Sequence, residues 1–71
     1  MGYILVKKGN YMGMLFKEDD AGAAISMARI IEGHAKYFDG KRKEMLVEDG
    51  EVTPEGLVWL NKRLTSTQEE L

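Results

Sequence analysis

The chain has 71 residues, none of which is cysteine and only one of which is histidine. Disulfides are therefore excluded, and a zinc site or a thiol nucleophile would lack its usual side chains. The 12 acidic and 10 basic side chains leave a net charge of −2, which by itself favours neither nucleic acid nor a membrane surface as a partner. At this length we expect a single domain, residues 1–71, with a small core.

Hydrophobic residues make up 44% of the chain, which is ordinary for a folded domain. Apolar stretches are short and interrupted, and the N-terminal segment lacks the basic lead and long apolar run of a signal peptide. We therefore expect a cytoplasmic protein with no membrane-spanning segment, whose last few residues fray.

The first element expected is an antiparallel hairpin made of residues 2–8 and 11–17. Both segments are rich in β-branched, aromatic and other apolar side chains, and Gly9-Asn10 tolerates the positive φ of a tight turn. Gly13 would weaken the second strand or mark a bulge. The alternation of polar and apolar residues is blurred, so the pattern does not assign each position to a face.

A helix is predicted from Ala21 to about Phe38. Asp19-Asp20 before it provides an N-cap and negative charge at the positive end of the helix dipole. Asp39-Gly40 is the stop signal. His34 falls on this helix beside the apolar stripe, where we expect it to pack at the edge of the sheet. The stripe itself recurs at helical spacing at Ala24, Met27, Ala28, Ile31, Ala35 and Phe38.

Two further strands and a second helix complete the chain. Residues 43–48 are predicted to form a strand, with Met45 and Val47 on one face and Leu46 on the other. A turn at residues 49–50 would return the chain as a short strand at 51–52. Thr53-Pro54-Glu55 is a helix start, followed by the stripe Leu57, Leu60 and Leu64. The order β-β-α-β-(β)-α predicts an α+β fold, in which a small antiparallel sheet packs against two helices.

No pattern of residues predicts a catalytic, metal or cofactor site. The glycines never form a Gly-x-Gly-x-x-Gly or Walker-type phosphate loop. Glu18-Asp19-Asp20 lacks the ligand spacing of a calcium loop, and helix capping accounts for its charge. An enzyme would depend on His34 and an acid that the fold brings near it. The sequence therefore favours a non-enzymatic protein without a cofactor.

Binding to another protein, as an inhibitor, adaptor or accessory subunit, is the function that the sequence favours. Val58 and Trp59 lie off the leucine stripe of the last helix, so they either anchor a partner or reach the core, and both alternatives stay open. An acidic run would steer the chain towards a basic surface, as a nucleic-acid mimic does. Phages and other mobile elements encode many short acidic chains and are an expected source. The acidic run is Glu48, Asp49, Glu51 and Glu55.

A nucleic-acid-binding module is the alternative function, and a homodimer is compatible with either. A domain of this size gains from sharing a core with a second copy. Small residues of the first helix (Gly22, Ala23 and Ser26) or the edge strand of the hairpin would supply that contact. Nucleic acid would bind the basic clusters, which are Lys7, Lys8, Lys41, Arg42 and Lys43.

Overall fold

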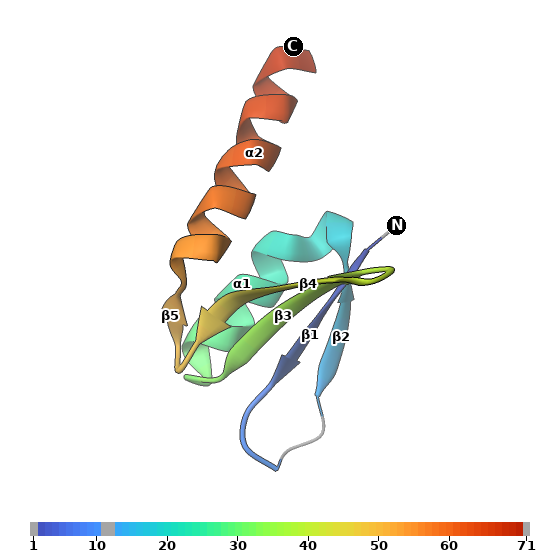
Figure 1. Cartoon of the computed structure of the whole chain (residues 1–71). Helices are drawn as coiled ribbons and strands as arrows, with labels where there is room; N and C mark the ends of the chain where they lie inside the picture. Colours follow the sequence, from blue (N-terminus) through green and yellow to red (C-terminus); the bar gives the residue numbers. More distant parts are fainter. Residues whose placement is uncertain (1, 11–12, 71) are drawn as a thin grey trace.

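The computed structural model describes residues 2–10 and 13–70, with side chains described as far as Arg63. Neighbouring strands pair antiparallel in the sheet order β2-β1-β3-β4-β5 (Figure 1). The predicted α+β class with an antiparallel sheet and two helices is confirmed. In chain order the elements are β1 (Tyr3–Lys7), β2 (Met14–Lys17), the 3-10 turn η1 (Glu18–Asp20), α1 (Ala21–Ile30), β3 (His34–Asp39), β4 (Arg42–Glu48), β5 (Glu51–Val52) and α2 (Pro54–Glu70).

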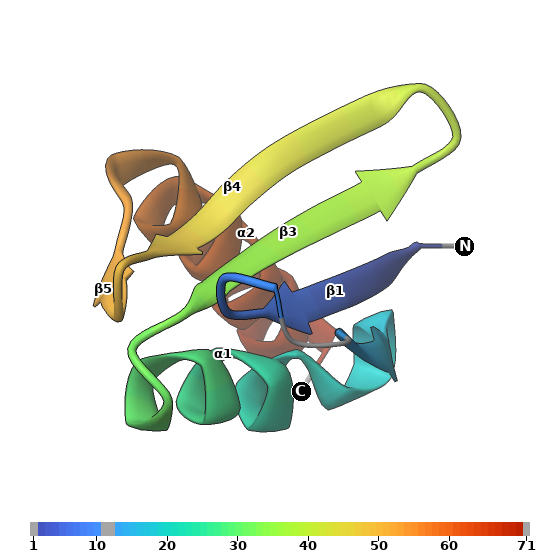
Figure 2. The same ribbon diagram turned by 90° about the horizontal axis from the view of Figure 1, so that it is seen from below.

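One face of the sheet is covered by the helices and the other is not. Side chains alternate between the faces along each strand, and the register sets Ile4 beside Tyr37 and Val6 beside Ala35 on the covered face. These four side chains are buried, together with the inward side of α1 and Trp59 of α2. Figure 2 shows α2 behind β3 and β4, with no helix in front of these strands. The core therefore lies between the sheet and the two helices.

The N-terminal hairpin is present as predicted, with shorter strands. β1 and β2 pair from Tyr3 opposite Lys17 to Val6 opposite Met14. Gly9 has a left-handed φ of 55°, as a turn here requires. The connection is longer than the predicted two-residue turn, and residues 11–12 within it lie outside the described residues.

The helix predicted over residues 21–38 is wrong in its second half. α1 ends at Ile30, and residues 34–39 form β3 in the middle of the sheet. The amide of Gly33 donates to the carbonyl of Ala28, and the amide of Glu32 donates to that of Arg29. This pair of hydrogen bonds closes a helix around a left-handed residue, which here is Glu32 at a φ of 55°. The structure therefore moves His34 from the first helix to a strand.

Both helices begin where expected, but only α2 uses the predicted cap. The Thr53 hydroxyl accepts a hydrogen bond from the amide of Gly56 at 2.9 Å, with Pro54 at the first helical position. Before α1 the acidic residues form η1, and the side chain of Asp20 makes no capping hydrogen bond within the described residues. The predicted Asp cap is therefore wrong, although the acids still lie at the positive end of the helix.

A bulge in β4 changes which faces its side chains occupy. Lys36 pairs with Met45, whereas its neighbour Ala35 pairs with Val47, so Leu46 is an extra residue. Met45 consequently lies on the uncovered face, while Leu46 and Val47 are both fully buried. The prediction that Met45 and Val47 share a face is wrong, because one extra residue reverses the alternation.

The buried side of α2 is not the leucine stripe. Leu57 is 53% exposed, whereas Trp59 is 8% exposed and packs on Tyr37 with ring centroids 5.0 Å apart. A Cβ at Gly56 would overlap the carbonyl oxygen of Leu46, so α2 lies directly against β4 at this glycine. Trp59, one turn later on the same side, is thereby turned into the core. The predicted fraying of the last few residues lies outside the residues and side chains that the structure describes, so it stays a prediction.

Candidate functional site

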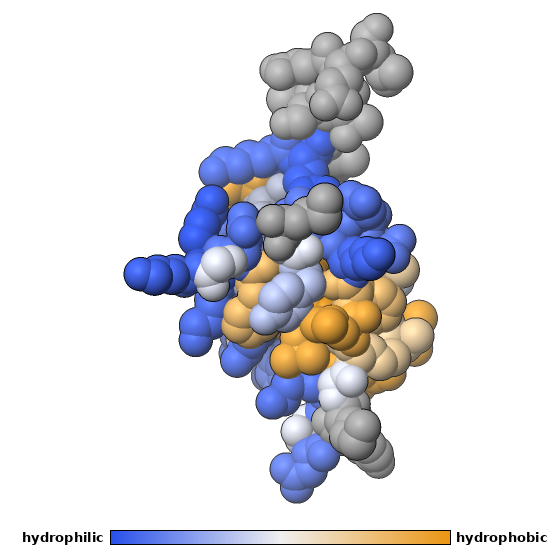
Figure 3. All heavy atoms as spheres, turned by 90° about the vertical axis from the view of Figure 1, so that its right-hand side faces the viewer, coloured by the Kyte–Doolittle hydropathy of each residue, from blue (hydrophilic) through white to orange (hydrophobic). Residues whose placement is uncertain are grey.

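The uncovered side of the sheet, which we call the open face, is the candidate functional site. It is formed by alternate residues of β1 to β4, whose neighbours along each strand face the helices. Figure 3, viewed from the side on which β2 is the edge strand, shows an apolar surface bordered by hydrophilic side chains. The open face comprises Tyr3, Leu5, Lys7, Leu15, Lys17, His34, Lys36, Phe38, Lys43, Met45 and, at the β5 end of β4, Glu48.

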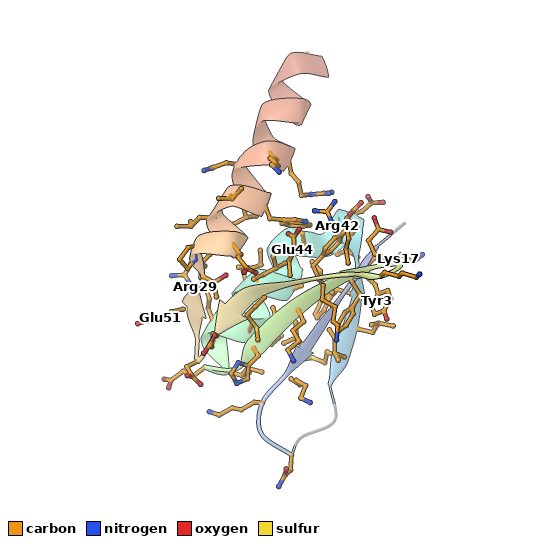
Figure 4. The ribbon with its side chains drawn as sticks, viewed as in Figure 1. Tyr3, Lys17, Arg29, Arg42, Glu44 and Glu51 are labelled. Atoms are coloured by element: carbon orange, nitrogen blue, oxygen red, sulfur yellow. The ribbon has the colours of Figure 1, made fainter. Side chains whose placement is uncertain are left out.

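One row of the open face crosses four strands and holds two aromatic rings between two lysines. Tyr3 lies opposite Lys17 on one side and Phe38 on the other, and Phe38 lies opposite Lys43. The rings of Tyr3 and Phe38 stack, with centroids 5.3 Å apart and planes 15° apart. Figure 4 shows Tyr3 next to Lys17, whereas Arg42 lies nearer α2. The row is therefore an aromatic pair with an ammonium group on each side.

The next row is apolar at the sheet edge and has a lysine near its centre. Leu15 lies opposite Leu5, Leu5 opposite Lys36, and Lys36 opposite Met45. Leu15 is 68% exposed, the second largest exposure among the large hydrophobic side chains described. Lys36 is half-buried, so its alkyl stem packs on its neighbours while its ammonium group can reach solvent.

The third row contains His34, which lies opposite Lys7. A hollow of about 270 Å³ opens here, lined by Lys7, Gly9, His34, Lys36 and Met45. The fold does bring an acid near the imidazole, because Asp49 lies 3.7 Å from Nε2. That distance is too long for a hydrogen bond, and the Asp49 side chain is 83% exposed. His34 is therefore not held in the geometry of a catalytic pair.

The open face is cationic even though the whole chain is acidic. Its first two rows hold lysines and apolar or aromatic residues only. Its acids are confined to the end next to β5, where Glu48 follows the buried Val47 onto this face and Asp49 lies in the turn beyond it. Arg42 and Glu44 face the helices and pair with each other at 2.6 Å. The lysines of the open face are Lys7, Lys17, Lys36 and Lys43.

The five basic residues predicted to bind nucleic acid do not form one cluster. Lys7 and Lys8 lie at one end of the sheet, and Lys41–Lys43 lie at the other, in and beside the β3–β4 turn. Lys7 lies opposite His34 and Lys43 lies opposite Phe38, so the two lysines are four residues, or about 13 Å, apart along β3. Lys7 and Lys43 lie on the open face together with Lys17 and Lys36, whereas Arg42 faces the helices. Sequence reasoning missed Lys36 because the apolar residues around it also fit a helix.

The residues predicted to bind a protein do not lie on one surface either. Glu48 and Glu51 lie opposite each other around the β4–β5 turn. With Asp49 they form an exposed group, which we call the acidic tip, whereas Glu55, on the first turn of α2, lines a groove between β4 and α2. Val58 is 55% exposed. Of the two alternatives for Trp59, the structure has the one in which its ring reaches the core, and the residue also lines the groove between β4 and α2.

A polar cluster fastens α2 to the covered face. Tyr37 donates a hydrogen bond to the Glu18 carboxylate, and Arg63 Nη1 lies 3.4 Å from the other carboxylate oxygen. The guanidinium of Arg63 also lies 4.7 Å from the centre of the Trp59 ring. The Tyr37 hydrogen bond holds the pKa of Glu18 below its ordinary value. Burial raises the pKa of Tyr37 to about 12. These groups tie η1, β3 and α2 together.

Comparison of the chain with protein-family models, curated proteins and solved structures finds no match. Among the described residues, no three His, Cys, Asp or Glu side chains gather in a way that could hold a metal ion. No helix in the same part of the chain has both the length and the apolar character needed to cross a bilayer.

Proposed function

We propose that this protein binds single-stranded nucleic acid on the open face. The observation that carries the proposal is the stacked pair of Tyr3 and Phe38 with Lys17 and Lys43 on either side. Proteins that bind single strands combine aromatic side chains, on which bases stack, with cations that pair with the phosphates. Both contacts tolerate many base sequences, so we expect weak sequence preference.

The local charge supports an anionic ligand on this face. Packing two open faces against each other would bring the four lysines of each copy together, with carboxylates only at the β4–β5 end. The net charge of −2 counts acids on the rest of the surface, and at physiological salt charges beyond about 8 Å are largely screened. A phosphate backbone lying on the open face therefore meets lysines first.

The aromatic pair favours a single strand over a duplex. In a duplex the base faces are stacked on one another, so Tyr3 and Phe38 could touch only sugars, phosphates and groove edges. In a single strand the bases can be splayed out and stacked on aromatic rings.

The proposal is tested by fluorescence anisotropy with short labelled single strands of DNA and RNA over a series of salt concentrations. The open-face variant is Lys17→Gln/Lys43→Gln, and the matched control is Arg29→Gln/Lys62→Gln, which removes the same charge from the exposed surface of the two helices. Each phosphate contact contributes a log–log salt slope of about −0.7, so the open-face variant should lose roughly 1.4 from the slope. The control should lose none.

A second pair of variants tests the stacking contact. Tyr3→Leu and Phe38→Leu keep an apolar side chain at each position but remove the ring, and each should weaken binding by about 1–3 kcal/mol if a base stacks there. Circular dichroism checks that the sheet is retained. Equal binding by the open-face variant and the control, or no wild-type binding at low salt, would overturn the proposal.

A partner protein is the second candidate, and one observation favours it. Leu57 and Val58 are neighbouring apolar side chains on α2, each more than half exposed. Val58 also lines a groove of about 510 Å³ between β4 and α2. Here the protein would block or bridge its partner sterically, and the acidic tip would steer it towards a basic surface.

Capture from a nuclease-treated lysate separates the two candidates. A protein retained by the wild type and lost with Leu57→Ser/Val58→Ser, but kept by Lys17→Gln/Lys43→Gln, would support the second candidate. Retention that depends on the two lysines and disappears with nuclease would support nucleic-acid binding.

A further inference from the structure

We propose that β2 is a homodimer interface, at which it pairs antiparallel with β2 of a second copy. β2 is an edge strand of the sheet, and within the described part of the chain it pairs with β1 alone. Such a dimer can form whether or not nucleic acid binds.

The hydrogen bonding of β2 leaves backbone groups facing outward. The amide of Glu18 donates to the carbonyl of Gly2 at 3.2 Å, which continues the β1–β2 ladder beyond the last strand residues. Hydrogen-bonded pairs recur at every second residue of an antiparallel ladder, so Phe16 bonds to Ile4 and Met14 to Val6. The amide and carbonyl groups of the residues between them, Leu15 and Lys17, therefore point away from β1.

A symmetric pairing centred on Leu15 fits these outward groups. It sets Leu15 opposite the partner's Leu15, Phe16 opposite the partner's Met14, and Lys17 opposite the partner's Gly13. Residues that lie opposite each other then share a face of the sheet, as antiparallel pairing requires. No like charges oppose one another, and three apolar side chains from each copy meet their counterparts.

The side chains of β2 are those of a strand that is covered in the assembled protein. Leu15 is 68% exposed and Met14 is 38% exposed. Edge strands that stay unpaired in solution are usually protected by proline, a bulge, an inward-pointing charge, a charged edge residue or a very short length; β2, with four residues, has neither proline nor bulge, and its one charge is the terminal Lys17. β5, at the other edge, is only two residues long and carries Glu51, so pairing there would oppose like charges.

Pairing at β2 makes the two open faces continuous. A two-fold axis through the Leu15 pair runs perpendicular to the sheet, so both open faces lie on the same side. The leucines of the second row then meet at the centre of the dimer, with Lys36 of each copy beyond them. The partner copy thereby doubles the length of the cationic surface.

Cysteine cross-linking tests the pairing directly, because the natural chain contains no cysteine. Leu15→Cys should form a covalent dimer under mild oxidation, since the paired Cα atoms would be about 5.5 Å apart, within the range of a disulfide. Leu57→Cys is the control, at a similarly exposed leucine on α2. We expect cross-linking at residue 15 to be on the order of tenfold faster, because association holds its thiols at high effective concentration.

A third cysteine variant tests the register. Lys17→Cys places the two thiols four residues apart along the paired strands, or about 13 Å, and should not cross-link faster than Leu57→Cys. Cross-linking at residue 17 with none at residue 15 would overturn the pairing centred on Leu15.

Analytical ultracentrifugation of the wild-type chain measures dimerisation in the absence of any disulfide. The wild type should show a monomer–dimer equilibrium that Leu15→Lys abolishes, because the substitution opposes two ammonium groups on the axis. Circular dichroism confirms that Leu15→Lys, at an exposed position, remains folded. A wild type that stays monomeric at millimolar concentration, with equal cross-linking at residues 15 and 57, would overturn the proposal.

Discussion

Tyr37 lies beneath Trp59 on the covered face and donates its hydroxyl hydrogen to the Glu18 carboxylate. Burial raises the pKa of Tyr37 to about 12, from an ordinary value of 10.0. Between these two pH values the folded chain holds a proton that the unfolded chain has lost. The contribution of Tyr37 to stability is therefore complete below pH 10 and is lost as the pH rises towards 12. Glu18 has the opposite sign, because its pKa is lowered and its contribution is lost in acid.

The variant Tyr37→Phe isolates the alkaline part of this behaviour. Its free energy of unfolding should fall less steeply than that of the wild type between pH 10 and pH 12, since it has no phenol to ionise. Urea denaturation at several pH values measures the difference. An ultraviolet titration should also lose the phenol that ionises near pH 12. A variant with the wild-type pH dependence would contradict the assignment.

Gly56 and Gly22 are both helical glycines, but their surroundings give substitution opposite effects. A Cβ at Gly56 would overlap backbone atoms of Leu46, whereas a Cβ at Gly22 meets nothing within 4 Å. Gly22→Ala should raise the free energy of unfolding by roughly 0.5–1 kcal/mol through helix propensity. Gly56→Ala should lower it by roughly 1–3 kcal/mol, because α2 must move off β4. Urea titration of the two variants checks both signs, and a stabilised Gly56→Ala would refute the close contact.

At the scale of elements, the segment after α1 shows where local pattern and tertiary pairing disagree. Ala35 and Phe38 continue the helical spacing of α1, so the sequence pattern extends the helix through them. In the structure the same segment is β3, which pairs with β1 on one side and β4 on the other. Hydrogen bonding on both sides and the burial of Ala35 and Tyr37 favour the strand over a continued helix.

The end of α1 is set by Glu32, which holds a left-handed conformation that favours glycine. Glu32→Gly should therefore raise the free energy of unfolding by about 1 kcal/mol, the steric cost of a Cβ at this φ. Glu32→Ala keeps the Cβ and should show no such gain. Thermal or urea unfolding of the two variants measures the difference, and an equal effect of both would show that the gain comes from removing the carboxylate.

At the scale of the whole molecule, one small core supports both helices. Trp59 joins α2 to Tyr37, and Leu46 and Val47 are buried beside the bulge of β4. A domain of this size has little stability to lose, typically about 5–15 kcal/mol. A substitution that empties the core therefore removes a large share of this stability, so a loss of binding in such a variant cannot be assigned to a lost contact.

Trp59→Ala illustrates this limit and should lower the free energy of unfolding by about 3–5 kcal/mol. Val58→Ala, at the exposed neighbouring position, should change it by less than about 1 kcal/mol. Urea denaturation followed by circular dichroism compares the two. A Trp59→Ala variant as stable as Val58→Ala would mean that the ring does not pack in the core.

Local signals in the sequence determined the α+β class, the N-terminal hairpin, the strands β4 and β5, and the threonine cap of α2. These features depend on residues within one turn or one strand of each other, which is the range over which propensity and capping act. The basic clusters and the acidic tip could also be identified as charged segments, but not their positions relative to one another.

Only the tertiary structure decided the identity of β3, the buried position of Trp59 and the composition of the open face. Each depends on which residues lie opposite one another across strands that are distant in the sequence. Tyr3 meets Phe38, and Lys17 joins them, only because β1 is paired on both sides. A single bulged residue in β4 is enough to change the face that Met45 occupies. Sheet register is a property of the whole fold, so the site it builds cannot be read from any one segment.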